Sequence, residues 1–433
     1  MKQENVYFKV EPKIVQADSE ATIKIVPLYD HCKFVDLAEY EVTYVPIEQF
    51  TRKTTFAFKP KYNVKLVEGA LYITEFFEGE QEHLLKIEEI FNGIRKYIGE
   101  FRIYSLENDL FSKRPYKGDM HMHSYHSDGQ ESPAFVAASC RKIGLDFMAI
   151  TDHELYHPSI EAQQAFTEVE LDLKIFRGEE VHAPDNFVHI INFGGSFSVN
   201  ELYKNHEEKY RKEVDEISNG IVDFPLGTNK YDYASSLWVY NKIHEGGGMS
   251  LFCHPYWICG DSYNHSTILS SYMFEKQPFD AYELIGGYHL DEVDSNKLQV
   301  ARYNEERANG RKIPIVGVSD AHGCENGNLF GWYYTIVFSS SLKLQDLITS
   351  VIDLNSVAVE ALPGETVRVY GPFRLVKYAL FLLREVFPAH DEMCLDEGKL
   401  MLKYVAGDTT VKNRLHELKG QTQKLLNQCW SKV

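Results

Sequence analysis

The first hundred residues alternate between hydrophobic and polar positions. Segments 21–26, 41–45 and 71–76 change face at every residue and are rich in β-branched and aromatic side chains, which is typical of half-buried strands. Segment 81–98 has hydrophobic spacings that fit either a strand or a helix. The pattern predicts a β-rich N-terminal domain, residues 1–110, built like a small β-sandwich. Because it shows no cluster of His and carboxylates, we expect it to pack or to present substrate rather than to do chemistry.

From residue 115 the pattern changes to short hydrophobic runs that alternate with amphipathic segments. We expect helices from Ser132-Pro133 onward and near 158–169, 200–217, 233–244 and 294–308. The expected strands are 120–123, 145–150, 174–176, 188–192, 249–253, 280–284, 313–318 and 333–338. Repeated strand–helix alternation implies parallel strands, so residues 115–340 are predicted to form an α/β sheet or barrel.

Residues 341–433 are predicted to be a mostly helical C-terminal region. Segment 373–387 is a strongly hydrophobic helix, and 411–430 is an amphipathic one. Such stripes are typical of a core or of a dimer surface. Residues 341–433 could therefore form the interface of a homo-oligomer or cover the mouth of an active site. The longest hydrophobic run, 378–383, is too short to cross a bilayer.

Composition and charge narrow the classes of function. Hydrophobic residues make up 44% of the chain and charged residues 25%, which is typical of a globular protein. The net charge of −18 repels phosphate backbones and anionic lipids, so we expect neither broad nucleic-acid binding nor membrane binding. Seven dispersed cysteines without a C-x-x-C pair, and a start that lacks the hydrophobic core of a signal peptide, predict reduced thiols and a cytoplasmic location.

Histidines and acids cluster at the ends of successive predicted strands. His121 and His123 are two residues apart, so both point to one face of a strand. The other such residues lie on a turn or directly after a predicted strand: Asp128, His153, Glu180, His254, Asp320 and His322. Because the carboxyl ends of barrel strands meet at one mouth, we expect these side chains to lie close together.

Imidazole and carboxylate groups are ligands that suit Zn, Mn or Fe, and the lack of clustered cysteines argues against a structural zinc site. Each motif alone has an ordinary explanation, such as a helix cap or a strand-end turn. Packing does not explain why all of them fall at strand ends in one segment. Since the candidates outnumber the ligands of one tetrahedral ion, the sequence predicts two or three divalent metal ions.

Five segments match, in order, the signature motifs of a known superfamily: 118–124, 127–129, 151–153, 253–255 and 319–322. Over roughly residues 115–340 the chain resembles the PHP (polymerase and histidinol phosphatase) superfamily. The N-terminal β domain before a G-D-x-H-x-H strand looks closest to carbaryl-hydrolase-like metallohydrolases. The resemblance implies a distorted (β/α)7 TIM-like barrel with a dinuclear or trinuclear site at its C-terminal face.

The resemblance also implies the metal ligands. Glu180 is preferred to Glu179, because the family glutamate stands two residues after a glycine. It would bridge two ions, of which the second also takes His254, with His189 as a further expected ligand. The first ion would be held by His121, His123, Glu180 and Asp320, and a third by Asp128, His153 and His322.

The expected reaction is hydrolysis of a small phosphomonoester or phosphodiester by a metal-bound hydroxide, with the metals neutralising the transferring group. Asp128 or His322 would supply a proton to the leaving oxygen. Arg177 is the cation best placed by sequence to bind substrate, and His126 and His157 are near enough to the motifs to touch it.

Other functions stay open or are disfavoured. The same site could hydrolyse a carboxyl ester, carbamate or amide. A non-catalytic module is less expected, because degenerate modules lose ligands and every motif position here is filled. The sequence contains no G-x-S-x-G elbow and no P-loop, which disfavours a covalent serine route and a nucleoside triphosphate cradle.

Overall fold

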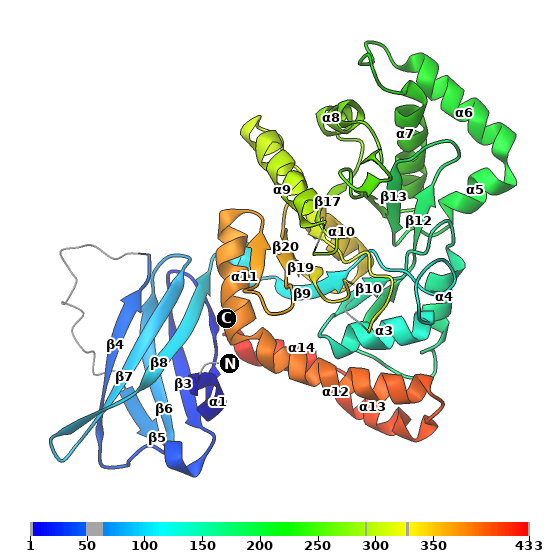
Figure 1. The fold of residues 1–433 in the computed structure, drawn as a ribbon. Coiled ribbons are helices and arrows are strands. Elements are labelled where there is room, and N and C mark those ends of the chain that lie inside the picture. The colour runs from blue at the N-terminus through cyan, green and yellow to red at the C-terminus, as the bar shows by residue number, and fades with distance from the viewer. Residues whose placement is uncertain (1–2, 49–63, 291, 326–328, 432–433) are drawn as a thin grey trace. The chain divides into compact units, whose positions relative to one another are not determined.

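The computed structural model describes residues 3–48, 64–290, 292–325 and 329–431 (Figure 1). The chain divides into two compact units. The smaller unit contains residues 1–114, 377–393 and 420–433, and the larger contains 115–376 and 394–419. The region 341–433, predicted as mostly helical, is therefore divided between the two units.

The smaller unit contains two four-stranded sheets. One has the order β1 (Phe8–Glu11), β3 (Ser19–Pro27), β6 (Ala70–Phe77), β5 (Val64–Val67), and the other has the order β2 (Ile14–Gln16), β8 (Ile94–Leu106), β7 (Glu82–Phe91), β4 (Glu39–Pro46). Side chains from both sheets, among them Ile25, Leu71 and Ile103, are fully buried in one core. The alternating pattern thus forms a β-sandwich, and segment 81–98 forms strands β7 and β8 rather than a helix.

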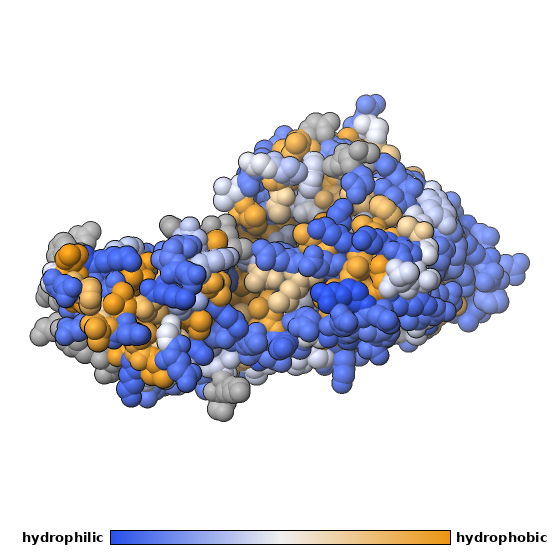
Figure 2. Space-filling view, turned by 90° about the horizontal axis from the view of Figure 1, so that it is seen from below, coloured by the Kyte–Doolittle hydropathy of each residue, from blue (hydrophilic) through white to orange (hydrophobic). Residues whose placement is uncertain are grey.

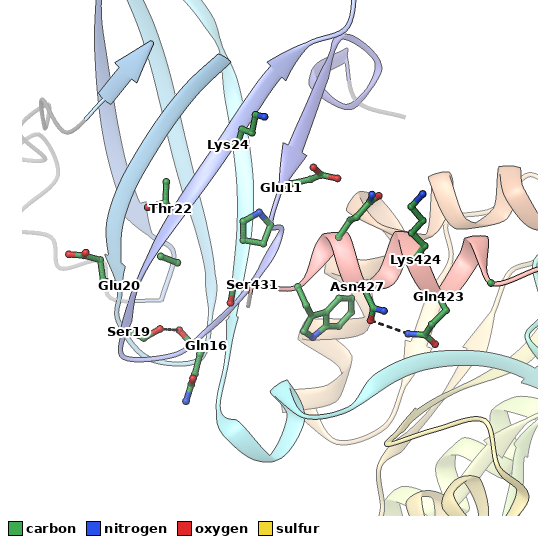
Figure 3. Close-up of a pocket in the computed structure, with 15 residues that line it drawn as sticks. Glu11, Gln16, Ser19, Glu20, Thr22, Lys24, Gln423, Lys424, Asn427 and Ser431 are labelled. Carbon is green, nitrogen blue, oxygen red and sulfur yellow. Dashed lines mark hydrogen bonds between the residues drawn. The ribbon is translucent and has the colours of Figure 1, made fainter. Parts of the chain in front are cut away.

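Three short helical segments also lie among these residues: α1 (Gln3–Tyr7), η1 (Asp30–Cys32) and α2 (Asn108–Phe111). A groove of about 910 Å³ is lined by residues of β3 and of α14 (Gln421–Cys429) (Figure 3). On the side of the groove formed by α14, Gln423 donates a hydrogen bond to Asn427 across 3.2 Å. The residues that line this groove include no histidine or cysteine, so we do not assign a metal site to the groove.

The larger unit contains two further large sheets. Their orders are β11 (Lys174–Phe176), β10 (Phe147–Ala149), β9 (Arg114–Asp119), β19 (Tyr333–Ser339), β20 (Ser356–Glu360), β21 (Arg368–Tyr370), and β12 (Gly178–His182), β13 (His189–Phe193), β14 (Met249–Phe252), β17 (Ala281–Ile285), β18 (Ile315–Gly317). Strands β9, β10 and β11 are parallel, and so are β14, β17 and β18. The predicted α/β class is confirmed, but the described strands form two sheets rather than one closed barrel.

Helices connect these strands, as the alternating pattern predicted (Figure 1). Ser132 accepts a hydrogen bond from the Phe135 N–H and so caps the first of them. The helices are α3 (Pro133–Lys142), α4 (His157–Gln164), α5 (Val199–Asn205), α6 (Glu207–Gly220), α7 (Lys230–Glu245), α8 (Thr267–Lys276), α9 (Val293–Ala308) and α10 (Leu344–Ile352). A two-stranded hairpin, β15 (Ile258–Cys259) with β16 (Ser262–Tyr263), follows β14.

The C-terminal helices are α11 (Phe373–Glu385), α12 (Phe387–Val405), α13 (Lys412–Leu418) and α14, with a short helical turn η3 (Thr409–Val411) before α13. The prediction of one helix over 411–430 was wrong. Gly420 has φ +78°, which is outside the helical region and ends α13 before α14 begins.

The expected strand at 120–123 was also wrong, because β9 ends at Asp119. The carboxylate of Asp119 accepts hydrogen bonds from the N–H groups of His121 and Ser319, and the Thr151 hydroxyl accepts one from Met122 N–H. These bonds add to a single bridge between Met122 and Ala321, in which the His123 N–H donates to the Ala321 carbonyl. Both histidines of the motif stay buried.

Figure 2 shows a mostly hydrophilic face with separate hydrophobic patches, which fits the net charge of −18. In the described part of the chain, no helix combines the length and the hydrophobicity needed to cross a bilayer.

A buried histidine in the sandwich predicts loss of stability in acid. His83 is fully buried, and its ring nitrogens lie 2.8 Å from the Tyr44 hydroxyl and 2.6 Å from the Ser105 hydroxyl. Burial lowers the pKa of His83 from 6.5 to about 3. The unfolded chain therefore binds the proton more readily, and the free energy of unfolding should fall by about 1.4 kcal/mol per pH unit between pH 6.5 and 3.

Urea unfolding of the wild type and of His83→Gln at pH 7, 6 and 5 measures how the free energy of unfolding depends on pH. Glutamine keeps a donor and an acceptor but does not titrate, so the variant should show a shallower pH dependence. His31→Gln, which changes an exposed histidine of the same unit, is the control and should keep the wild-type slope. Equal slopes for wild type and His83→Gln would contradict the prediction.

Candidate metal centre

A buried carboxylate, Glu180, lies at the centre of a group of histidines. It stands in β12 and has no exposed surface. Its Oε1 lies 2.8 Å from His189 Nδ1 and 3.6 Å from His254 Nε2, and its Oε2 lies 2.7 Å from His153 Nδ1. Residues from the ends of β10 and β14 and the start of β13 are thus brought to one carboxylate.

Asp320 provides a second carboxylate beside the first. Its Oδ1 lies 3.1 Å from His121 Nε2 and 2.8 Å from His123 Nε2. The same two nitrogens lie 3.4 and 3.5 Å from Glu180 Oε2. The loop after β9 and the loop after β18 therefore meet at β12, as the strand-end pattern predicted.

A third group lies at a more exposed edge. Asp128 Oδ2 is 3.2 Å from both His153 Nε2 and His322 Nε2, and Asp128 Oδ1 is 3.7 Å from His123 Nδ1. The ligand atoms of these four residues all lie within 4.8 Å of one another. The side chains of Asp128 and His322 are 52% and 35% exposed, whereas that of His123 is fully buried. The centre therefore has a closed interior and an accessible edge.

Glu179, the neighbour of Glu180, faces the other side of β12. Its carboxylate accepts hydrogen bonds from the Ser198 hydroxyl, the Val199 N–H and the side-chain amides of Asn192 and Asn200. It therefore anchors the start of α5 and does not reach the histidines, which agrees with the preference for Glu180.

Two residues near the centre were missed by the sequence analysis. Glu283 Oε2, in β17, lies 3.1 Å from His121 Nδ1. His182 Nε2 lies 3.4 Å from Glu180 Oε1 and 3.1 Å from His153 Nδ1. A signal existed for both: Glu283 is the one acid in the hydrophobic run 281–285, and His182 is two residues after Glu180 in a strand and so shares its face.

The structure does not bring the predicted substrate-binding residues into this group. Arg177 is exposed, and its Nε lies 3.5 Å from Gln163 Oε1. His126 Nε2 lies 2.7 Å from Glu161 Oε2, and its ring centroid is 4.9 Å from that of His157. The two histidines form a separate pair at α4.

The loop between His123 and Asp128 is held by Asp152. Its carboxylate accepts hydrogen bonds from the N–H and hydroxyl of Ser124 and from the Ser127 hydroxyl, at 2.6 to 2.7 Å. Gly129 closes the loop, and a Cβ there would lie 2.6 Å from the backbone carbonyl of His123. The T-D-H and S-D-G motifs thus position the ligands as well as supply them.

Two of the candidate ligands have an unusual backbone. His254 has φ +24° and Asp320 has φ +51°, a region that residues with a Cβ rarely adopt. Strain of this kind persists where the surrounding structure imposes it, and it concentrates at functional sites. Here it aims both side chains at the same buried group.

The electrostatics of the group keep its acids ionised. Burial alone would raise the pKa of the Glu180 carboxyl, but the surrounding imidazoles, His153 first, hold it well below its usual value. Burial likewise opposes ionisation of Asp320, whose pKa is lowered by His121 and His123. Hydrogen bonds from His153 and His322 lower the pKa of Asp128 against the effect of burial. The carboxylates are therefore ionised within this group of histidines.

Several buried atoms of the group have no hydrogen bond of acceptable geometry. They are both carboxylate oxygens of Glu180, His121 Nε2, His123 Nδ1, His189 Nδ1, His254 Nδ1 and Glu283 Oε1. Buried polar atoms are almost always paired, so this set indicates a missing partner. Imidazole nitrogen and carboxylate oxygen are the donors that divalent transition metals prefer. The residues present fit divalent metal ions.

No family model matches the sequence. Over 63 residues the chain is 44% identical to the DNA polymerase/3'-5' exonuclease PolX of Bacillus subtilis (strain 168), a match that covers 14% of this chain and 11% of that protein.

Three solved structures are similar over about half of the chain. A two-domain protein containing a predicted PHP-like metal-dependent phosphoesterase, from Bacteroides vulgatus, is 16% identical with a TM-score of 0.40 and covers 57% of this chain and 65% of its own. A putative metal-dependent phosphoesterase from Bifidobacterium adolescentis is 19% identical, with a TM-score of 0.32. The match covers 49% of this chain and 90% of that protein. An amidohydrolase from Chromobacterium violaceum with bound sulfate is 16% identical, with a TM-score of 0.31. The match covers 57% of this chain and 99% of that protein.

The names of the first two structures describe metal-dependent phosphoesterases, the class that the motifs of this chain predict. The matched part spans about two thirds of the Bacteroides protein and a small fraction of the polymerase. Because the three TM-scores lie below 0.5, the function of this chain is argued below from the residues of the centre.

Removal of the Glu283 carboxylate should weaken metal binding. A carboxylate on the second ring nitrogen of a ligating histidine fixes the tautomer and orientation of the ring, and its loss typically costs 10-fold or more in affinity. Glu283→Ala should therefore raise the dissociation constant for Zn²⁺ or Mn²⁺ by about 10-fold, measured by calorimetry on metal-free protein.

Glu283→Gln is the matched control, because its amide oxygen still accepts a hydrogen bond from His121 Nδ1. It should bind metal more tightly than Glu283→Ala. Circular dichroism of both variants would show that the fold is intact. Wild-type affinity in a folded Glu283→Ala would contradict the role of this carboxylate.

Proposed function

We propose that this chain is a metal-dependent phosphoesterase that hydrolyses a small phosphomonoester or phosphodiester. The observation that carries the proposal is the buried, unpaired donor set around Glu180, which joins the ends of several strands. The sequence motifs that resemble those of the PHP superfamily support the reaction class. We further propose that the two sheets of the larger unit correspond to the distorted (β/α)7 barrel of that superfamily.

We assign the metal ligands as the motifs predict, with His189 among them because its Nδ1 reaches Glu180. Divalent ions bound there supply Lewis-acid activation of water and neutralise charge on the phosphoryl oxygens. The chain holds these ions through His121, His123, His153, His189, His254, His322, Asp128, Glu180 and Asp320.

The substrate approaches the centre from the edge formed by Asp128 and His322, since these are its exposed residues. His322 Nδ1 donates a hydrogen bond to the carbonyl oxygen of Asp320 across 2.8 Å. Once the ring is neutral, its Nε2, which lies 3.2 Å from Asp128 Oδ2, would be free to bind an ion. The Asp128 carboxyl group, which is 52% exposed, would then orient water and pass a proton to the leaving oxygen.

In this proposal divalent ions held by the centre would supply the positive charge for the phosphate, and Arg177 is not assigned to it. That guanidinium lies against Gln163 and is exposed.

Parallel assays with three nitrophenyl substrates test the proposal. The protein, loaded with Mn²⁺ or Zn²⁺, is given 4-nitrophenyl phosphate, bis(4-nitrophenyl) phosphate and 4-nitrophenyl acetate. We expect at least one phosphate ester to be hydrolysed with the higher kcat/KM. Faster turnover of the acetate would instead favour the carboxyl-ester, carbamate or amide alternative, and no turnover of any phosphate ester by metal-loaded protein would overturn the proposal.

Loss of a central carboxylate should abolish most of this activity. Asp320→Asn removes a negative charge that faces His121 and His123, and treatment with a chelator removes the ions. Both should lower kcat/KM by about 100-fold or more, and readdition of metal should restore only the chelated wild type. Glu208→Gln, an exposed acid on α6, is the control and should keep full activity and metal content. An active Asp320→Asn with normal metal content would contradict the assignment.

A further inference from the structure

A second group of possible metal ligands lies outside the centre. His126 Nε2 is 2.7 Å from Glu161 Oε2, and the ring centroid of His126 is 4.9 Å from that of His157. We call these three residues the α4 group. The assignment of ligands around Glu180 uses none of them, so the proposed reaction leaves this group without a role.

Helix α4 carries two of the three side chains. His157 is its first residue and Glu161 follows four positions later, and residues four apart on a helix are neighbours on its surface. Both contact His126, one through the ring contact and the other through the ion pair. Two ligands four residues apart on a helix, with a third from another segment, is the arrangement that zinc sites of the H-E-x-x-H type use.

The loop before Asp128 fixes the position of His126. The His126 N–H donates a hydrogen bond to Ser124 Oγ across 3.3 Å, and the Tyr125 ring packs against the imidazole with ring centroids 4.4 Å apart. Ser124 Oγ in turn donates to the carboxylate of Asp152 at 2.6 Å. The third side chain is therefore presented by the anchored loop that also carries Asp128.

The distances in the α4 group are compatible with a bound ion. A tetrahedral ion with bonds of about 2.0 Å holds its ligand atoms about 3.3 Å apart, so the His126–Glu161 pair would open by about 0.6 Å to admit one. The side chains of His126 and Glu161 are 23% and 42% exposed, and His157 is exposed. A hydrated ion can therefore reach all three side chains from solvent.

An ordinary surface ion pair explains only part of this group. A His–Glu pair at the surface contributes little to stability, and it does not account for the second imidazole. Two imidazoles and one carboxylate are the ligand set of open zinc and iron sites, in which water fills the remaining positions. Because the set contains no thiolate, it suits a divalent ion such as Zn²⁺ better than a soft ion such as Cu(I).

We propose that His126, His157 and Glu161 form a further metal site, which binds one divalent transition-metal ion apart from the centre around Glu180. The bound ion would join the loop that carries Asp128 to helix α4. This inference does not rest on the phosphoesterase function, because it concerns side chains that the proposed reaction does not use.

Zinc content tests the proposal. Metal-free protein is equilibrated with micromolar free Zn²⁺, and the bound zinc is measured by elemental mass spectrometry. His157→Ala and Glu161→Gln should each bind one Zn²⁺ per chain fewer than the wild type. His416→Ala, which changes an exposed histidine elsewhere in the larger unit, is the control and should keep the wild-type zinc content.

Two outcomes of this measurement would overturn the proposal. Wild-type zinc content in both variants, with the fold confirmed by circular dichroism, would show that the α4 group holds no ion. Loss of more than one ion would show that these residues support the centre instead of forming a site of their own. Either outcome leaves the phosphoesterase proposal to be judged by the nitrophenyl assays.

Chemical modification reads the same site residue by residue and needs no variant that disturbs the fold. Diethyl pyrocarbonate acylates accessible imidazoles, and a bound ion slows this reaction. Peptide mass spectrometry of the wild type should show that Zn²⁺ protects His126 and His157 but not His416. Glu161→Gln should lose this protection. Equal modification of His126 and His157 with and without Zn²⁺, or protection that persists in Glu161→Gln, would overturn the proposal.

Discussion

The structure of the larger unit depends on one buried carboxylate and its imidazole neighbours. An ionised carboxyl group without access to water costs several kcal/mol unless positive charge and hydrogen-bond donors compensate for it. Glu180 has six histidines within 3.6 Å: residues 121, 123, 153, 182, 189 and 254. Each comes from a different position along the chain, so the carboxylate is stable only when several strands have paired correctly.

The arrangement of strands explains why these residues meet. β9 and β10 are parallel, as are β14, β17 and β18, and ligands follow them at their carboxyl ends. The antiparallel strand β13 begins where β14 ends, because Ile190 pairs with Phe252. His189 and His254 therefore face Glu180 from neighbouring strands. The hydrophobic core below these loops, with Ile191, Leu251 and Val316 fully buried, keeps the strand ends in place.

Much of the centre could be predicted from the sequence, because its residues combine a distinctive type with a distinctive position. His153, His254 and Asp320 closely follow hydrophobic runs, and His121 and His123 alternate with methionines. Neither pattern depends on knowing which strands pair. The two motif histidines are brought together even though β9 ends before them. The Asp119 carboxylate accepts hydrogen bonds from the N–H groups of His121 and Ser319, and Met122 forms a bridge with Ala321.

The rest depends on contacts that a single sequence does not contain. Glu283 becomes significant only once β17 lies next to β14 and β18, and His182 only once it stacks on His189 with ring centroids 3.9 Å apart. Arg177 follows β11 and precedes the Glu180 segment in the sequence, but its side chain lies with Gln163. The two-sheet arrangement and the division of the C-terminal helices between two units likewise follow from long-range packing.

The adjacent glutamates of β12 have a consequence for how the centre forms. Successive residues of a strand point to opposite faces, so Glu179 locks the start of α5 while Glu180 enters the histidine group. A slip of β12 by one residue would send each acid to the wrong side, leaving α5 without its anchor and the histidines without their anion. The doublet thus favours one alignment of the strand, since a shift by one residue in either direction would leave both the helix anchor and the histidine group incomplete.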